Sequence, residues 1–328
     1  MSSQAQTSQA KIDLLDLYRR MLLIRRMEEQ LGEVVKSGEL PGPVHLYIGQ
    51  EAVAVGICAQ LTDADWIAST HRGHGHFLAK GGDPRAMVAE ILGRDTGICR
   101  GKGGSMHVAD FSRGILGANG IVGGGVGLAV GAALAAQLDG AQRVSVVFFG
   151  DGGANQGVVM EAINVAVLWK LPLLLVCENN GFSEFSTTSS VTAGEIAARA
   201  IPYGAHSAVV DGNDVQAVHA TAAEALARAR TGAGPTLIEA RTYRWRGHVE
   251  TEKSFLSGEY RTEAEIASWV ERDPIAHVRA QLIADGVPSE RVETVQRDIE
   301  ALVQQAYAQA MADPLPAEST AFDDMFAH

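Results

Sequence analysis

Apolar residues follow two different periods along the chain, and their alternation predicts the secondary structure. Helical spacing predicts helices at 11–37, from Gly49-Gln50 to about Leu61, from Asp83-Pro84 onward, at 119–138, 154–170 and 215–230, and from 262 to about Met311. Short apolar runs predict strands at 66–70, 144–149, 171–177, 207–210 and 236–241. Because the clearest strands are apolar throughout and alternate with helices, we expect an α/β fold: a doubly wound, mostly parallel sheet with helices on both faces.

The same pattern indicates the domain organisation. No repeat or linker interrupts 11–312, which we expect to form a single domain with helical ends, preceded by a disordered N-terminus at 1–10 and followed by a loose tail at 313–328. The helix at 119–138 is small and apolar on all sides, so we expect it to be buried. Polar residues at 249–261 predict a mobile loop.

Composition narrows the classes of function. With 27 Lys and Arg against 39 Asp and Glu, the net charge is −12 and the lysines do not cluster, which argues against nucleic-acid or anionic-membrane binding. No apolar run reaches the ~18 residues of a membrane span, and residues 1–10 lack the features of a secretion signal. Three cysteines, Cys58, Cys99 and Cys177, are too few and too scattered for a disulfide framework, so we expect a reduced, cytoplasmic protein.

Glycine is overrepresented, with 36 residues, but two familiar phosphate motifs are absent. A Walker loop would need a hydroxyl residue after Gly101-Lys102, and the spacing is one residue short. A dinucleotide fingerprint would need glycine or alanine where Asn155 follows the 144–149 strand. Neither nucleotide motif therefore explains the glycines.

Two polar motifs stand at the ends of consecutive predicted strands. Gly150-Asp151-Gly152 follows one strand and Asn179-Asn180 follows the next, at the sheet edge where α/β proteins bind ligands. Gly152 and Gly153 allow a phosphate to approach the backbone, and Asp151 beside a phosphate requires a divalent cation between them. Asp151, Asn180 and a nearby backbone carbonyl suit Mg²⁺ with diphosphate oxygens completing the shell. The alternative is an ordinary turn with an Asx cap.

The GDG and NN pair at this spacing resembles the thiamine-diphosphate motif, and the surrounding sequence resembles one family. That family is the α subunit of the thiamine-diphosphate-dependent E1 component of 2-oxo-acid and acetoin dehydrogenase complexes. The matching segments are HLYIGQEA (45–52), STHRGHGH (69–76), GKGGSMH (101–107), GANGIVGGG (117–125), FFGDGGANQG (148–157), LWKLPLLLVCENNG (168–181), RGH (246–248) and the YR…DPI stretch (260–275). Together they span most of the chain and are far more specific than any one segment.

The resemblance implies a role for each matching position. Asp151, Asn180 and the carbonyl of Phe182 would bind the magnesium. Gly120 and Val122 would contact the aminopyrimidine ring through their backbones. Arg72 and His248 would contact the diphosphate, and His71, Gly152 and Gly153 are further cofactor-binding candidates. For Arg72, bidentate phosphate contact agrees with its place after a predicted strand, and the alternative is a surface arginine.

Histidines near these motifs are candidates for proton transfer. The resemblance places His45, His74 and His248 near cofactor or substrate, where near-neutral imidazoles suit carbonyl chemistry. His74 and His76 would share one face of an extended segment, with His71 on the other. We assign His76 to a structural role and His107 to fixing the glycine-rich loop. A zinc site among these histidines is a weaker alternative, because no cysteine or carboxylate cluster accompanies them.

The resemblance also implies a partner chain and a substrate. The glutamate that activates the cofactor belongs to a separate E1 β subunit in this family, so we expect an α2β2 heterotetramer that passes an acyl group to a lipoyl-bearing E2 acyltransferase. THRGHGH, GANGIVGGG and NNGFxE are similar to the acetoin dehydrogenase branch, which implies cleavage of acetoin into acetaldehyde and an acetyl unit. Pyruvate or a branched-chain 2-oxo acid is the alternative substrate. A nicotinamide-dependent dehydrogenase or a non-catalytic scaffold of the same fold is a more remote alternative.

Overall fold

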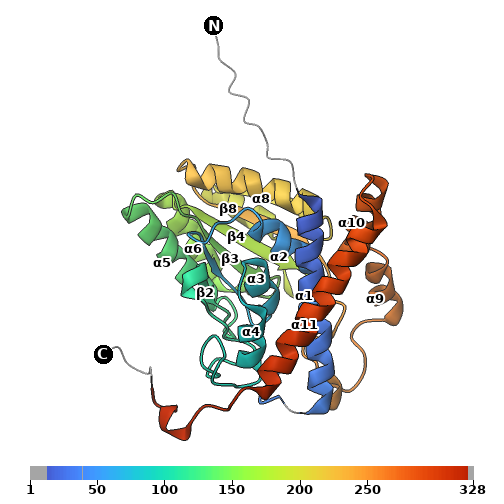
Figure 1. Ribbon diagram of the computed structural model, residues 1–328. Helices are drawn as coiled ribbons and strands as arrows, with labels where there is room; N and C mark the ends of the chain where they lie inside the picture. Colours follow the sequence, from blue (N-terminus) through green and yellow to red (C-terminus); the bar gives the residue numbers. More distant parts are fainter. Residues whose placement is uncertain (1–12, 39, 324–328) are drawn as a thin grey trace.

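A single six-stranded parallel sheet forms the centre of the computed structural model, which describes residues 13–38 and 40–323 (Figure 1). The predicted disorder at 1–10 lies outside the described residues. The strands follow one another across the sheet in the order β2 (Ile115–Gly117), β1 (Trp66–Ala68), β3 (Ser145–Gly150), β4 (Leu173–Asn179), β8 (Thr236–Arg241) and β7 (His206–Asp211). All neighbouring pairs are parallel, which confirms the predicted fold class.

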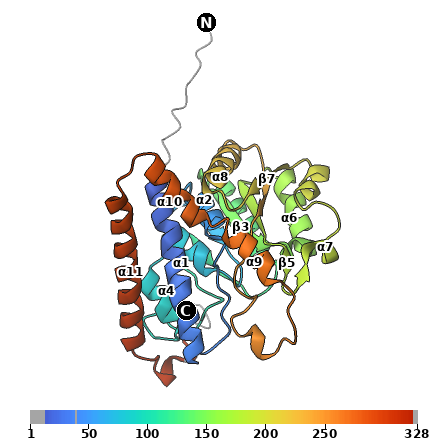
Figure 2. The same cartoon turned by 90° about the vertical axis from the view of Figure 1, so that its right-hand side faces the viewer.

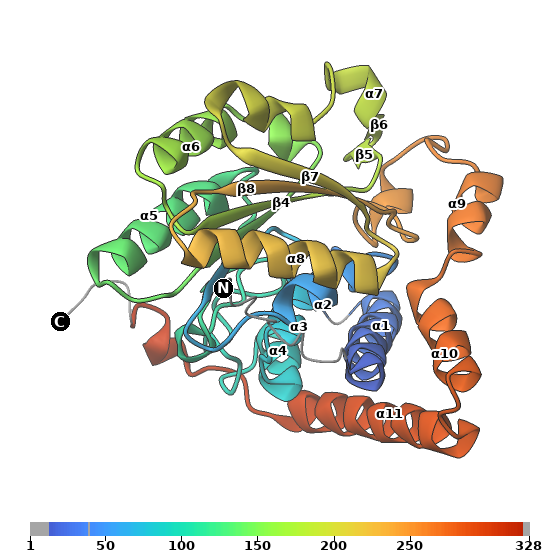
Figure 3. The ribbon, with the colours of Figure 1, turned by 90° about the horizontal axis from the view of Figure 1, so that it is seen from above.

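Helices cover both faces of the sheet (Figure 3). The α-helices of the described residues are α1 (Leu14–Ser37), α2 (Glu51–Cys58), α3 (His74–Ala79), α4 (Pro84–Ile91), α5 (Gly124–Leu138), α6 (Gly157–Leu168), α7 (Thr188–Val191), α8 (Val215–Arg230), α9 (Glu263–Val270), α10 (Pro274–Ala284) and α11 (Ser289–Ala312). A small antiparallel hairpin, formed by the two-residue strands β5 (Phe182–Ser183) and β6 (Ser186–Thr187), follows β4. No helix in the described part of the chain is long and apolar enough to cross a membrane.

Alternating side chains of each strand belong to two separate hydrophobic cores. On β3, Val146 and Phe148 face the larger core, which α1, α2, α8 and α11 complete. Val147 and Phe149 face the smaller core, which is covered by α5 and α6. The central strands β3 and β4 are mostly apolar because both of their faces are buried, whereas the edge strand β7 is partly exposed. The C-terminal helices α10 and α11 lie beside α1 (Figure 2).

Local sequence sets several helix ends. Asp13 caps α1 by accepting hydrogen bonds from Leu15 N and Asp16 N, and Gly38 ends the helix at φ 77°. Asp83 and Asp273 cap α4 and α10, and each precedes a proline in the first turn. These are signals that the sequence displays directly.

Two local predictions are wrong. The segment of His74 and His76 is helical (α3) rather than extended, so the expected alternation of faces does not hold. The helix predicted at 119–138 begins at Gly124, and it is buried on one face only, because Leu128 and Leu138 are exposed. The small residues of α5 pack one face of the helix against the sheet, and the opposite face of the helix is exposed.

Two segments predicted to be loose make specific contacts. In the 249–261 loop, Arg261 is buried and donates to the carbonyl oxygens of Arg244 and Arg246 at 2.6 and 2.7 Å. At the start of the predicted tail, Asp313 accepts a hydrogen bond from Arg85 at 2.6 Å. Both segments are thus tied to the domain at identifiable points.

Candidate active site

A cavity of about 440 Å³ opens at the carboxyl ends of β3 and β4. Its walls come from segments far apart in sequence: the loop before α2, the loop after β1, the 119–126 turn and the loop after β8. Eleven of the twelve site residues predicted from the sequence line it: His45, His71, Arg72, Gly120, Val122, Asp151, Gly152, Gly153, Asn180, Phe182 and His248. The twelfth, His74, lies elsewhere.

The acidic side of the cavity is formed by Asp151, which is 1% exposed. Strand register places it there, since Gly150 pairs with Glu178 and both strands end at the same edge. One carboxylate oxygen, Oδ2, accepts a hydrogen bond from the hydroxyl of Thr188, whereas Oδ1 is buried and has no hydrogen-bond partner among the described residues. Burial raises the pKa of Asp151 above its ordinary value. A buried carboxylate oxygen without a partner is a favourable ligand for a cation.

Asn180 lies on the adjoining strand end and contacts two neighbours. Its Nδ2 donates to Oε1 of Gln50 at 3.0 Å, and its Oδ1 accepts from the backbone N–H of Phe182 at 3.2 Å. An amide oxygen retains a second lone pair after one such bond. Asp151 and Asn180 therefore present oxygen atoms to the same cavity, as a hard divalent cation requires.

The basic side of the cavity contains two buried guanidinium groups. Arg72 donates to the carbonyl oxygens of Leu46 and His248 at 2.6 and 3.0 Å. Arg244, which is 1% exposed, donates to His248 Nδ1 at 2.9 Å. Burial and the nearby Arg244 lower the pKa of Arg72 to about 9, so the cavity stabilises an anion next to it. A diphosphate fits this pair of cations.

Three imidazoles meet beside these arginines. The ring centroids of His45, His71 and His248 lie 4.7, 5.0 and 5.3 Å apart. Burial, followed by the charge of Arg72, lowers the pKa of His45 to about 3, and the same causes hold His71 and His248 at about 2. One nitrogen of each ring could approach a common metal ion, but two guanidinium groups beside the cluster oppose a cation there. The neutral rings instead offer hydrogen bonds to an anionic ligand or substrate.

His74 and His76 are buried away from the cavity. His74 is fully buried, with Nδ1 at 2.8 Å from Glu28 Oε1 and Nε2 at 3.0 Å from Ser105 O. His74 is thus absent from the cavity wall and both of its ring nitrogens have partners within the chain, and its expected position near the cofactor stays a prediction. His76 stacks on Phe148 at 3.8 Å between centroids, as suits a structural residue.

The glycine-rich segment at 97–107 is organised by one buried carboxylate. Glu90 accepts four backbone hydrogen bonds, from Cys99, Gly101, Gly103 and Gly104, at 2.6 to 3.1 Å. His107 Nδ1 lies 3.2 Å from the carbonyl oxygen of Gly103, consistent with a role in fixing this loop. The loop thereby brings Met106 to the cavity wall.

Gly152 has a packing role that the sequence does not reveal. A Cβ at Gly152 would lie 2.3 Å from Oγ of Ser183, so the loops after β3 and β4 approach each other there. At Gly120 a Cβ would meet nothing closer than 3.7 Å. Glycine is thus required at 152 for loop contact, whereas at 120 the chain itself leaves room.

The sequence alone assigns no role to several further cavity residues, among them Gln50, Glu178 and Arg244. Glu178 is 4% exposed, accepts a hydrogen bond from the hydroxyl of Tyr47, and lies 3.2 Å from Nε2 of His76. Gln50 lies within the HLYIGQEA segment, and Glu178 lies directly before Asn179-Asn180. Arg244 lies two residues before the RGH segment. Their neighbours were the available signal.

Comparison with known proteins shows the family of this chain. The model of the dehydrogenase E1 component family matches residues 19–319. The chain is 45% identical over 312 residues to the α subunit of acetoin:2,6-dichlorophenolindophenol oxidoreductase of Bacillus subtilis (strain 168), covering 94% of this chain and 92% of that one. The corresponding α subunit of Cupriavidus necator is 44% identical, with 96% and 95% covered. The pyruvate dehydrogenase E1 α subunit of Zymomonas mobilis is 41% identical, with 95% and 88% covered.

The chain therefore belongs to the dehydrogenase E1 component family. It is an α subunit of a thiamine-diphosphate-dependent oxidoreductase, as the sequence motifs predicted. The family assignment argues against the nicotinamide-dependent and non-catalytic alternatives.

Proposed function

We propose that this chain binds the magnesium diphosphate half of thiamine diphosphate in the cavity at the ends of β3 and β4. The single observation that carries the proposal is the buried Oδ1 of Asp151, which has no hydrogen-bond partner among the described residues and belongs to a residue that lines the same cavity as Asn180. Mg²⁺ would be bound by Asp151, Asn180 and the carbonyl oxygen of Phe182. His71, Arg72, Gly152, Gly153 and His248 would surround the diphosphate, and Gly120 and Val122 the aminopyrimidine ring.

The chain's residues act on charge and protons around the bound coenzyme. When bound, thiamine diphosphate supplies a nucleophilic carbon that adds to a carbonyl group and accepts the electrons of the broken bond. Arg72 and Arg244 would neutralise the diphosphate charge, and the buried walls would exclude water. His45 and His248 are neutral in the cavity, so each could donate or accept a hydrogen bond at the substrate.

We propose acetoin as the substrate, cleaved to acetaldehyde and an acetyl group that passes to a lipoyl-bearing E2 acyltransferase. The support is the likeness to two acetoin oxidoreductase α subunits and the THRGHGH and NNGFxE segments at the cavity. Pyruvate or a branched-chain 2-oxo acid is the second candidate, supported by the pyruvate dehydrogenase relatives. The working form would be a cytoplasmic α2β2 heterotetramer with an E1 β subunit.

An Asp151→Asn variant tests the cofactor site. Co-expressed with its β subunit, the wild-type protein should bind thiamine diphosphate in a Mg²⁺-dependent manner, measured by quenching of tryptophan fluorescence. The variant should lose at least about 100-fold in affinity, because a neutral amide replaces the charged ligand. Equal binding with and without Mg²⁺, or unchanged affinity in the variant, would contradict the proposal.

Dye reduction by the co-expressed α and β subunits, with acetoin or pyruvate as substrate, tests the proposed substrate. We expect a higher kcat/KM for acetoin. A higher value for pyruvate would overturn the substrate while leaving the cofactor site intact.

A further inference from the structure

Gln50 is a buried cavity residue whose two amide atoms have different surroundings. It immediately precedes α2 and is 1% exposed. Its Oε1 accepts a hydrogen bond from Nδ2 of Asn180 at 3.0 Å, across 130 residues of sequence. Its Nε2 is buried and has no hydrogen-bond partner within the described chain. A buried amide nitrogen without a partner costs free energy unless a ligand accepts its hydrogen bond.

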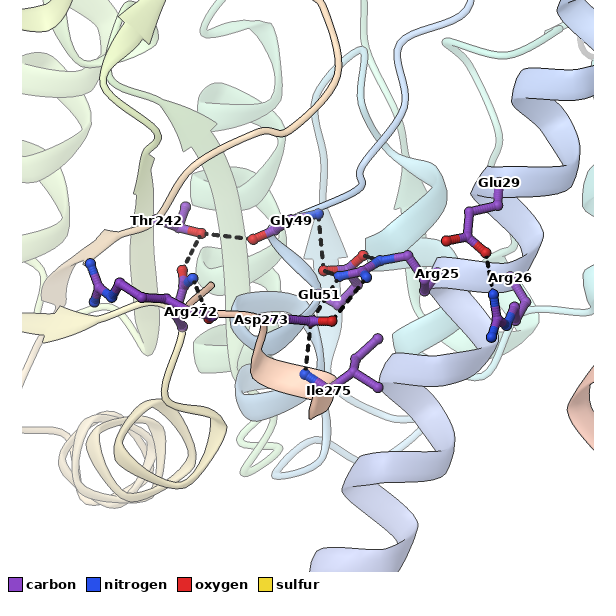
Figure 4. A network of polar contacts seen from close by, with 10 residues as sticks. Arg25, Arg26, Glu29, Gly49, Glu51, Thr242, Arg272, Asp273 and Ile275 are labelled. Carbon is purple, nitrogen blue, oxygen red and sulfur yellow. Dashed lines mark hydrogen bonds and ion pairs between the residues drawn. The ribbon is translucent and has the colours of Figure 1, made fainter. Parts of the chain in front are cut away.

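The backbone around Gln50 is held by a buried ion-pair network (Figure 4). Glu51 Oε2 accepts from the N–H of Gly49 at 3.0 Å, and Glu51 forms a bidentate pair with Arg25 at 2.6 and 3.1 Å. Asp273 contacts the same guanidinium at 3.2 Å. The turn before α2 is thus fixed from α1 and α10, and Gln50 has little freedom to move.

Gly49 closes this turn from the other side. Its φ is +101°, and a Cβ there would lie 2.4 Å from the carbonyl oxygen of Tyr243. The hydroxyl of Thr242 donates to the carbonyl oxygen of Gly49 at 3.3 Å. The segment after β8 therefore packs closely against Gly49, the residue before Gln50.

We propose that Gln50 is a positioning residue for the cation site: it sets which end of the Asn180 amide faces the cation, and it donates its own N–H into the cavity. An amide side chain can present either oxygen or nitrogen by a half-turn. By accepting from Nδ2, Gln50 retains the nitrogen on its own side and leaves the oxygen for the cation. Its Nε2 would then donate a hydrogen bond to an anionic oxygen of the bound ligand. The inference rests on the proposed cofactor site.

Two substitutions distinguish the hydrogen-bond acceptor of Gln50 from the space that its side chain fills. Gln50→Met has similar length and volume but no acceptor, whereas Gln50→Glu retains an acceptor for Nδ2 of Asn180. Mn²⁺ serves as the probe, and its binding to the co-purified αβ protein with thiamine diphosphate is measured by electron paramagnetic resonance. We expect Gln50→Met to weaken Mn²⁺ binding by about 10–100-fold, the usual effect of losing a group that orients a ligand. Gln50→Glu should restore most of that affinity.

Controls distinguish this inference from the function on which it rests. Gln305→Met, on the exposed side of α11, should bind Mn²⁺ as the wild-type protein does. If the wild-type protein binds no Mn²⁺, or Asp151→Asn binds it normally, the cation site and the inference both fail. If those two behave as expected but Gln50→Met binds Mn²⁺ normally, or Gln50→Glu binds as weakly as Gln50→Met, only the positioning role is overturned. Thermal unfolding of each variant establishes that the chain is folded.

Discussion

The protonation of the cavity side chains is set by burial and by their shared neighbours. His45, His71 and His248 lie against Arg72 and Arg244, and the pKa of each imidazole is far below the ordinary value of about 6.5. Asp151, on the opposite side, has a raised pKa because it is buried. The cavity thus holds buried charged groups on both sides. A diphosphate would stabilise the arginines and a cation would stabilise Asp151.

These depressed pKa values predict that the chain loses stability as the pH falls below about 6.5. The unfolded chain binds a proton at each histidine in that range whereas the folded chain does not, so acid favours unfolding. Between pH 8 and pH 5.5, each of the three histidines should reduce the free energy of unfolding by about 1 kcal/mol. Urea unfolding of the isolated chain at both pH values measures the difference.

His45→Gln supplies the comparison. The variant should show a loss between pH 8 and 5.5 that is smaller by about 1 kcal/mol, because glutamine does not titrate. His206→Gln, exposed on β7, serves as the matched control. The same pH dependence in His45→Gln and wild type would contradict the assignment.

At the scale of elements, α2 connects the cavity to the larger core. All eight of its residues are buried, and it packs between α1, α3 and α8. Its close approach to α8 depends on Gly56, where a Cβ would lie 2.6 Å from Cγ1 of Val218. The position of Gln50, and through it that of Asn180, depends on how α2 is seated.

Gly56→Ala should therefore destabilise the chain, although alanine favours helices. The added methyl group forces α2 and α8 apart, and overpacking of this kind costs about 1–3 kcal/mol. The matched control is Gly131→Ala on α5, where a Cβ would meet nothing within 4 Å. That variant should stabilise the isolated chain by about 0.5–1 kcal/mol. Denaturant unfolding compares the two, and an equal effect would show that the helix contact does not limit stability.

At the scale of the whole molecule, the helices that cover the smaller core carry apolar side chains on their outer faces. Large apolar side chains are exposed on and around α5 and α6: Ile121, Val122, Leu128, Leu138, Leu168 and Trp169. Val122 also lines the cavity, so this surface reaches its opening. Exposed apolar patches beside a site are typical of subunit interfaces, and the E1 β subunit would cover the patch and complete the cavity.

Leu128→Glu should prevent assembly without unfolding the chain. Leu128 is 53% exposed, so a charge there is tolerated in the isolated chain but would be buried in the heterotetramer. Sedimentation velocity of the co-expressed subunits should show separate chains. Met311→Glu, on α11 over the other core, should assemble normally. Normal assembly of Leu128→Glu would place the partner on a different face.

Much of the site could be predicted because it lies at strand ends. Asp151 and Asn180 follow apolar strands directly, and parallel strands end at a common edge, so their proximity follows from local pattern alone. The position of His74 could not be predicted in this way. Its sequence neighbours lie at the cavity, but its helical backbone turns it toward Glu28.

By itself, the sequence determined five of the six strands of the main sheet, most helices, the parallel arrangement and the two polar strand ends, because each depends on residues that are close together in the chain. Only the tertiary structure decided which distant side chains meet: Gln50 with Asn180, and three histidines from three separate loops. It also decided that α5 is open on one side. A helix of small apolar residues has the same pattern whether its own chain or a partner covers it, so burial within the chain could not be read from periodicity.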